Sequence, residues 1–132
     1  MSPETDRHLS ALVVEDSGIL VERLREMLEG VEGIDIIDVV DSEMAALTAI
    51  RNAPIDVVLL DLKLRQGDGF GVLHAVPVDS MRPVFVVLSN YSLSEYRDAA
   101  QQLGAAFFLD KLHEMESLPA VLCEIRQRRP AH

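Results

Sequence analysis

Several residue types are scarce in this chain, and each scarcity excludes some classes of structure or function. Cys123 is the only cysteine, so no disulfide forms within the chain and nothing indicates an oxidising compartment. The 12 basic residues face 22 acidic ones, and the formal net charge of −10 disfavours direct binding to a nucleic-acid backbone. Aromatic residues make up only 5% of the chain, so aliphatic side chains must fill the core.

Long hydrophobic runs are also missing. The longest ones, Val57–Leu60 and Val84–Leu88, are much too short to span a bilayer. The first ten residues are polar and acidic, without the apolar centre of a signal peptide. We therefore expect a cytoplasmic protein without a membrane segment. The length of 132 residues predicts a single domain, 1–132, with a core at about 8–128.

The chain does contain a regular alternation of short apolar runs with stretches of helical period. Five runs are predicted to be strands: Leu9–Val14, Ile34–Val40, Val57–Leu60, Val84–Leu88 and Ala106–Leu109. A helix is predicted after each strand, and Cys123 is expected on the apolar side of the last one. This alternation predicts an α/β fold with a parallel sheet that has helices on both faces.

Polar side chains follow four of the predicted strands at the points where the strands end. They are Glu15-Asp16, Asp61, Ser89 and Lys111. In such a sheet the carboxyl ends of the strands form the ligand site, so these groups are expected to converge. Carboxylates that meet repel one another, and a hard divalent cation with oxygen ligands, best matched by Mg²⁺, resolves the repulsion.

The same residues indicate the chemistry of the site. The first strand is followed by two carboxylates and a single Gly18, so the glycine loop that cradles a nucleotide phosphate is missing. A phosphoryl group is acceptable there only with a metal bound and with Lys111 to balance the charge. Phosphoryl transfer needs mainly positioning and charge neutralisation, and Asp61 is then the nucleophile that forms an aspartyl phosphate.

Four motifs give the chain a specific resemblance to a known family. Each motif closes a predicted strand, and together they are Val13-Val14-Glu15-Asp16, Asp61-Leu62-Lys63-Leu64 with Gly67-Asp68-Gly69, Val87-Leu88-Ser89, and the run from Gly104 to Asp110-Lys111. In this order they resemble the receiver domains of two-component response regulators over about residues 8–128. The resemblance implies the flavodoxin-like, doubly wound (βα)5 fold with a five-stranded parallel sheet in the order 2-1-3-4-5.

The resemblance also implies a role for each residue at the site. Asp61 would be the phosphoacceptor, with Ser89 and Lys111 contacting the phosphoryl oxygens. Metal ligands would be Glu15, Asp16, Asp61 and the backbone carbonyl of Lys63, holding Mg²⁺ or, as an alternative, Mn²⁺. Ser89 and Phe108 would form the switch that moves on activation.

Partners follow from the same family. The phosphoryl donor would be a phosphohistidine on a sensor histidine kinase or a phosphotransfer protein. The surface of the fourth helix, the fifth strand and the fifth helix would then change its affinity for an unidentified protein target or for a second copy of the chain. On that surface we expect Leu93, Tyr96, Arg97, Leu118 and the arginine-rich end of the last helix. The chain would not be an enzyme beyond catalysing its own phosphorylation and dephosphorylation.

The sequence departs from the family pattern at several positions. Arg65 and Leu112 each replace a common Pro, so a cis peptide before Leu112 is not expected. Asn90 stands where a small residue is usual. Lys63 and Tyr91 occupy two variable positions beside the acceptor, and because both are large we hypothesise slow self-dephosphorylation.

Three alternatives stay open at this point. The chain could be the receiver part of a larger response regulator or hybrid kinase. It could be a receiver-like interaction module that is never phosphorylated, although the acidic trio and Lys111 favour phosphorylation. It could also be a flavodoxin-like nucleotide or flavin enzyme, which the missing glycine loop disfavours.

Overall fold

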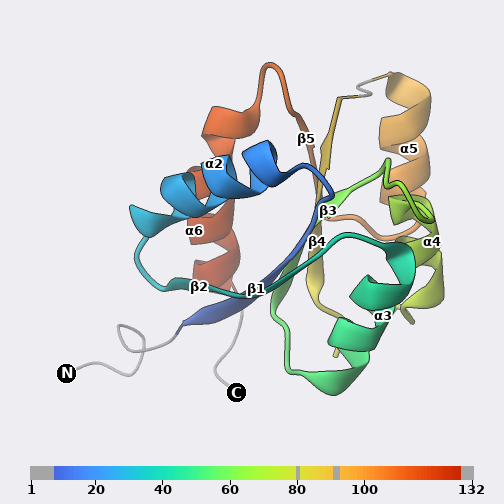
Figure 1. Cartoon of the computed structure of the whole chain (residues 1–132), viewed down its shortest axis with the longest axis horizontal. Helices are drawn as coiled ribbons and strands as arrows, with labels where there is room; N and C mark the ends of the chain where they lie inside the picture. The colour runs from blue at the N-terminus through green and yellow to red at the C-terminus, as the bar shows by residue number, and fades with distance from the viewer. Residues whose placement is uncertain (1–7, 80, 91–92, 129–132) are drawn as a thin grey trace.

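The computed structural model describes residues 8–79, 81–90 and 93–128, and these residues form one α/β unit (Figure 1). Five parallel strands make a single sheet in the order β2-β1-β3-β4-β5, which confirms the predicted topology. The strands are β1 (Leu9–Val14), β2 (Ile34–Val40), β3 (Val57–Asp61), β4 (Val84–Ser89) and β5 (Phe107–Asp110). The observed bounds of the strands differ from the predicted ones by at most one residue.

Helices cover both faces of the sheet, with α2 and α6 on one face and α3, α4 and α5 on the other (Figure 1). Their bounds are α2 (Gly18–Glu29), α3 (Glu43–Asn52), α4 (Gly69–Ala75), α5 (Ser94–Gln102) and α6 (Leu118–Arg128), the last preceded by the short 3₁₀ helix η1 (Met115–Ser117). No helix in the described part of the chain is long and apolar enough to cross a bilayer.

The core is divided into two apolar layers by the sheet. Val57 and Leu59 of β3 contribute to the layer under α2 and α6, whereas Val58 and Leu60 contribute to the layer under the other three helices. Successive side chains of a strand point to opposite faces, so a strand covered on both faces must be apolar at every position. This is why the uninterrupted apolar run predicted a central strand, and Asp61 is the polar residue at its end.

Two predictions about α6 are wrong. Leu118 was expected on an exposed contact surface, but it is fully buried, as are Leu122 and Ile125. Cys123 was expected on the apolar side of the helix, but it is exposed. The buried residues are spaced by four and three positions, and Cys123 is one residue, or roughly 100°, away from that stripe.

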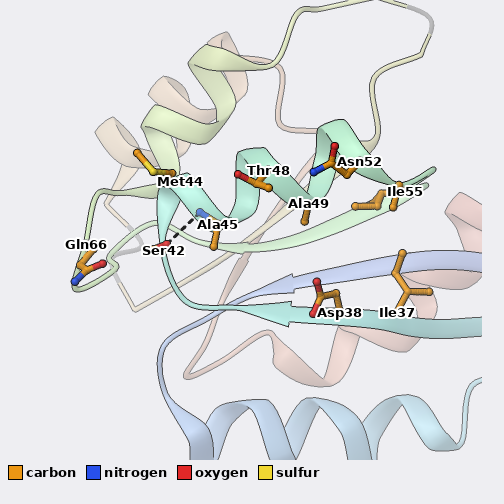
Figure 2. A pocket seen from close by; sticks show the side chains of 11 residues that line it. Ile37, Asp38, Ser42, Met44, Ala45, Thr48, Ala49, Asn52, Ile55 and Gln66 are labelled. Carbon is orange, nitrogen blue, oxygen red and sulfur yellow. Dashed lines mark hydrogen bonds between the residues drawn. The ribbon is translucent and has the colours of Figure 1, made fainter.

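The edge strand β2 contains a bulge. Ala11 pairs with Ile36 and Leu12 pairs with Asp38, so Ile37 is the extra residue. As a result the side chains of Ile37 and Asp38 both line a groove of about 630 Å³ beside α3 (Figure 2). Bulges and exposed charges on an edge strand hinder pairing with another strand, so these features protect the open edge of the sheet.

Two close contacts hold α4 and α5 against the sheet. The N–H of Gly69 donates to the Leu62 carbonyl, and a Cβ at Gly69 would lie only 2.6 Å from the Asp61 carbonyl oxygen. The Arg82 guanidinium donates to the carbonyls of Val76 and Leu103, at 2.9 and 2.8 Å. Val76 and Leu103 end α4 and α5, so one cation satisfies the C-terminal carbonyls of two helices.

Candidate functional site

The candidate site lies where the strands end, as the parallel topology requires. Glu15 and Asp16 directly follow β1, Asp61 is the last residue of β3, Ser89 is the last residue of β4, and Lys111 directly follows β5. All five strands run in the same direction, so these ends share one edge of the sheet. The structure therefore brings together the residues that the sequence predicted to meet.

Three carboxylates form the centre of the site. One carboxylate oxygen from each of Glu15, Asp16 and Asp61 lies within 4.8 Å of the other two. Glu15 is 4% and Asp61 is 7% exposed, whereas Asp16 is half-buried and lines an open pocket together with Glu15. A set of oxygen donors without histidine or cysteine fits a hard cation such as Mg²⁺ or Mn²⁺, and the open side at Asp16 leaves room for water ligands.

Lys111 places an ammonium group among these carboxylates. Its Nζ lies 2.8 Å from Glu15 Oε2 and 3.1 Å from Asp61 Oδ2. The Lys111 side chain is only 9% exposed, so its aliphatic part is covered while its charge is paired with two carboxylates. Two buried carboxylates and one ammonium leave a net negative charge, which favours a further cation.

The burial of Glu15 has an electrostatic consequence. Desolvation raises the pKa of Glu15 above its usual value of 4.5, and repulsion from Asp61 raises it further, while the hydrogen bond from Lys111 lowers it. Removal of the carboxyl from water is the dominant cause. A metal bound at the trio would oppose this shift because it favours the ionised carboxylate.

Backbone N–H groups hold each carboxylate of the trio. Glu15 Oε1 accepts from Ser17 at 3.1 Å, and Asp61 Oδ1 accepts from Lys63 at 3.3 Å. Asp16 Oδ2 accepts the N–H of Arg65 at 2.8 Å. Proline has no N–H, so Arg65 supplies a contact to the acid pair that the Pro common at this position in the family could not make.

The two residues predicted as the switch lie on neighbouring strands, Ser89 at the end of β4 and Phe108 on β5. Ser89 is completely buried, and its carbonyl accepts the N–H of Lys111 at 2.9 Å. Phe108 is half-buried and packs against the layer under α3, α4 and α5. Lys63 is exposed, whereas Tyr91 lies outside the described residues. Their roles in switching and in phosphoryl lifetime stay predictions.

One group near the site was missed from the sequence. Glu114 lies four residues beyond Asp110, and its Oε1 accepts the N–H of Asp110 at 2.9 Å and the guanidinium of Arg97 at 2.6 Å. Arg97 was predicted only as part of an exposed contact surface. A spacing of four between a strand end and a glutamate is too common to identify such a contact in a sequence.

The sequence is similar to that of known proteins over most of its length. The sequence model of the response regulator receiver domain matches residues 11–122. A protein-glutamate methylesterase/protein-glutamine glutaminase of Nitratidesulfovibrio vulgaris is 32% identical over 117 residues, which cover 88% of this chain and 32% of that protein. Protein-glutamate methylesterase/protein-glutamine glutaminase 5 of Myxococcus xanthus is 35% identical over 104 residues, which cover 78% of this chain and 30% of that protein. The chain thus spans about a third of the length of these curated relatives.

Solved structures agree with the fold. The signal receiver domain of the response regulator NarL from Mycobacterium tuberculosis has a TM-score of 0.83 at 24% identity, covering 93% of this chain and 99% of that one. The Mn²⁺-bound form of the response regulator Rcp1 has a TM-score of 0.74 at 25% identity, covering 91% of this chain and 93% of that one. With its five-stranded sheet, its acidic trio and the sequence match over residues 11–122, this chain belongs to the response regulator receiver domain family.

Proposed function

We propose that this receiver accepts a phosphoryl group on Asp61 from a phosphohistidine of a sensor histidine kinase or a phosphotransfer protein, with Mg²⁺ bound at the acidic trio. One observation carries the proposal: the Asp61 carboxylate lies at the end of a buried strand, between Lys111 at 3.1 Å and the metal-compatible pair Glu15 and Asp16. Family membership fixes two-component signalling as the general function, and these contacts point to the residues that perform it.

Each residue has a defined part in the transfer. An Asp61 carboxylate oxygen forms the new O–P bond while the N–P bond of the donor histidine breaks, and the released imidazole takes up a proton. Lys111 turns from Asp61 to the phosphoryl oxygens, and Ser89 donates its hydroxyl to one of them. Glu15, Asp16, Asp61 and the Lys63 carbonyl would hold a divalent cation, which would supply neutralisation of the charge on the phosphoryl oxygens. The chain acts only on its own phosphorylation and dephosphorylation.

Mg²⁺ is the preferred cation in this proposal because the donor set consists of oxygens and the site is open to water on one side. Rcp1 has been solved with Mn²⁺, and Mn²⁺ is the alternative metal for this chain. Slow self-dephosphorylation, expected from Lys63 and Tyr91, and a cytoplasmic location both stay predictions.

The output surface is proposed to be the face of α5, β5 and α6. Leu93 is 59% exposed at the start of α5, and Tyr96 and Arg97 are half-buried on the same helix. Phosphorylation changes the charge at the strand ends, and movement of Ser89 and Phe108 would carry that change to this face. Its partner is either an unidentified protein or a second copy of the chain, and no direct contact with nucleic acid is proposed.

The main alternative to a stand-alone receiver is a receiver that forms part of a larger response regulator or hybrid kinase. The curated relatives are about three times as long as the matched region, so a receiver linked to an output domain is compatible with the same site. The mass of the full-length gene product decides between a stand-alone receiver and a receiver within a longer chain.

The central test is incubation with acetyl phosphate and Mg²⁺, followed by intact mass measurement. The native chain should gain one phosphoryl group, and chelation of the metal should prevent the gain. Asp61→Asn should gain nothing, whereas Asp98→Asn, a change of the same chemistry on the exposed side of α5, should behave like the native chain. No gain on the native chain would reject the proposal in favour of an interaction module that is never phosphorylated, and an equal gain on Asp61→Asn would reject Asp61 as the acceptor.

A further inference from the structure

The loop between β5 and α6 carries Lys111 into the site, yet it lacks the proline that commonly follows this lysine in the family. The peptide before Leu112 is trans, and the Leu112 side chain is 77% exposed, so packing of this side chain does not anchor the loop. A loop that positions a buried ammonium group must be fixed in another way, because a displacement of about 1 Å at a reacting group costs up to about 100-fold in rate.

Hydrogen bonds within the loop supply part of this restraint. Asp110 Oδ1 accepts the N–H of Leu112 at 2.7 Å, and the Asp110 carbonyl accepts the N–H of Glu114 at 2.8 Å. Glu114 completes the ring because its Oε1 accepts the N–H of Asp110 at 2.9 Å. Asp110 is therefore held on its N–H, its carbonyl and its side chain, and Lys111 is the next residue.

Arg97 attaches this ring to α5. Its guanidinium donates to Glu114 Oε1 at 2.6 Å and to the Phe108 carbonyl at 3.2 Å. The same guanidinium lies 4.7 Å from the centroid of the Phe108 ring, a cation–π contact. The hydrogen bond from Arg97 is also the main reason why the pKa of Glu114 lies below its usual value. One side chain thus connects α5, β5 and the loop that carries Lys111.

We propose that Glu114, braced by Arg97, is a positioning residue for phosphoryl transfer: it holds the β5–α6 loop so that the Lys111 ammonium stays at the acidic site, within reach of Asp61 and of the phosphoryl group that Asp61 accepts. This inference rests on the proposed function, because it assigns the pair a role in the reaction at Asp61. Glu114 is not itself a catalytic residue, since it acts on the reacting groups only through the loop.

The energetics favour positioning of the loop, rather than stabilisation of the fold, as the role of the Arg97–Glu114 ion pair. The side chains of Arg97 and Glu114 are 37% and 39% exposed. Ion pairs at such exposure are screened by water and contribute little to folding stability. The Glu124–Arg128 pair offers a matched control, because its atoms are 2.7 Å apart and Glu124 is 41% exposed, but both residues belong to α6 and neither belongs to the loop.

The test compares Glu114→Ala, Glu114→Gln, Arg97→Ala, the double variant Arg97→Ala/Glu114→Ala and the control Glu124→Ala. Phosphorylation by acetyl phosphate is followed by intact mass over a series of Mg²⁺ concentrations. Glu114→Ala should lower the maximal rate by about 10-fold, since the loop loses one of its restraints. The Mg²⁺ concentration for half-maximal rate should not change, because Glu114 does not contact the acidic trio.

The other variants separate positioning from a general structural effect. In Glu114→Gln the side-chain amide oxygen still accepts the N–H of Asp110, so this variant should recover the rate to within about 3-fold of the native chain. Residues that act as one unit are not additive, so the double variant should be no slower than Glu114→Ala. Glu124→Ala should match the native rate, and thermal unfolding checks that every variant is folded.

The outcomes distinguish this inference from the proposed function. A native chain that gains no phosphoryl group, or gains it equally in Asp61→Asn, removes the proposed function and this inference with it. A native chain that is phosphorylated only through Asp61 while Glu114→Ala keeps the native rate rejects the inference alone. Equal rate losses in Glu114→Ala and Glu124→Ala, or additive losses in the double variant, also overturn it. If Glu114→Ala does not fold, Arg97→Ala decides by the same readout: a lower maximal rate than that of Glu124→Ala at an unchanged Mg²⁺ requirement supports the inference, and a native rate overturns it.

Discussion

Lys111 Nζ contacts Glu15 and Asp61 at the same time, at 2.8 and 3.1 Å, and so links the end of β5 to the ends of β1 and β3. Without a bound metal this ammonium is the cation that makes two buried carboxylates tolerable next to each other. The lysine therefore has a structural role in the resting state that is separate from its proposed contact with the phosphoryl group.

Replacing Lys111 by Met should destabilise the metal-free chain. Glu15 and Asp61 would keep their burial and lose their shared cation, and removing one partner from a buried ion pair costs about 3 kcal/mol. Urea unfolding of both chains without metal measures this loss. Saturating Mg²⁺ should restore a large part of it in Lys111→Met; equal losses with and without Mg²⁺ would contradict a metal at the trio.

Binding of Mg²⁺ should itself raise the unfolding temperature. At about 100 times its Kd, a ligand that binds only the folded state adds about 2.7 kcal/mol. Asp16→Asn should weaken Mg²⁺ binding by at least about 10-fold, since it removes a charged ligand while its amide oxygen still accepts the N–H of Arg65. Asp41→Asn, an exposed neighbour, is the control, and similar Mg²⁺ responses of the two variants would exclude Asp16 as a ligand.

The Arg97–Glu114 pair should give a pH-dependent contribution to stability. The hydrogen bond from Arg97 lowers the pKa of Glu114 from its usual value of 4.5. A carboxyl whose pKa is lower in the folded state contributes stability above the unfolded pKa and loses it as the pH falls through the folded pKa. The difference in unfolding temperature between the native chain and Glu114→Gln should therefore stay constant down to about pH 5 and narrow below about 4.5. A difference that grows under acid would contradict this sign.

Arg82→Met should destabilise the fold without affecting the acidic site. The guanidinium caps the C-terminal carbonyls of α4 and α5 and lies 4.7 Å from the ring centroid of Phe85. The loss of two charge-assisted hydrogen bonds should lower the free energy of unfolding by about 2–4 kcal/mol. Each kcal/mol should lower the unfolding temperature by about 3–5 °C. The acetyl phosphate rate at a temperature where the variant is folded should equal that of the native chain, because Arg82 contacts no residue of the trio.

The strands and the site were predictable from the sequence because both follow local rules. A buried parallel strand must be apolar at every position, which marks Val57–Leu60, and its polar last residue is then forced to the edge that the other strand ends share. Which side chains of a helix are buried was less predictable, since the exposure of Cys123 and the burial of Leu118 depend on the rotation of α6 about its own axis against the sheet. Even a shift of one residue along a helix moves a side chain by roughly 100°.

Contacts between distant side chains away from the shared strand ends could not be predicted. Nothing in the sequence shows that Arg82 reaches Val76 and Leu103, or that Arg97 lies over Phe108. The bulge at Ile37 was missed for a similar reason, because it depends on the register between two strands. Long side chains have many rotamers, and their choice of partner is fixed only by the packed tertiary structure.

The absence of a side chain at Gly69 lets α4 begin in direct contact with the backbone of the acceptor strand. The start of α4 lies directly against the backbone of Asp61 and Leu62, with no space for even a methyl group between them. Acceptor and helix are therefore expected to behave as one rigid body during signalling. We therefore expect any rearrangement on phosphorylation to occur away from the junction of β3 and α4, on the side of the sheet where Ser89 ends β4 and Phe108 lies on β5.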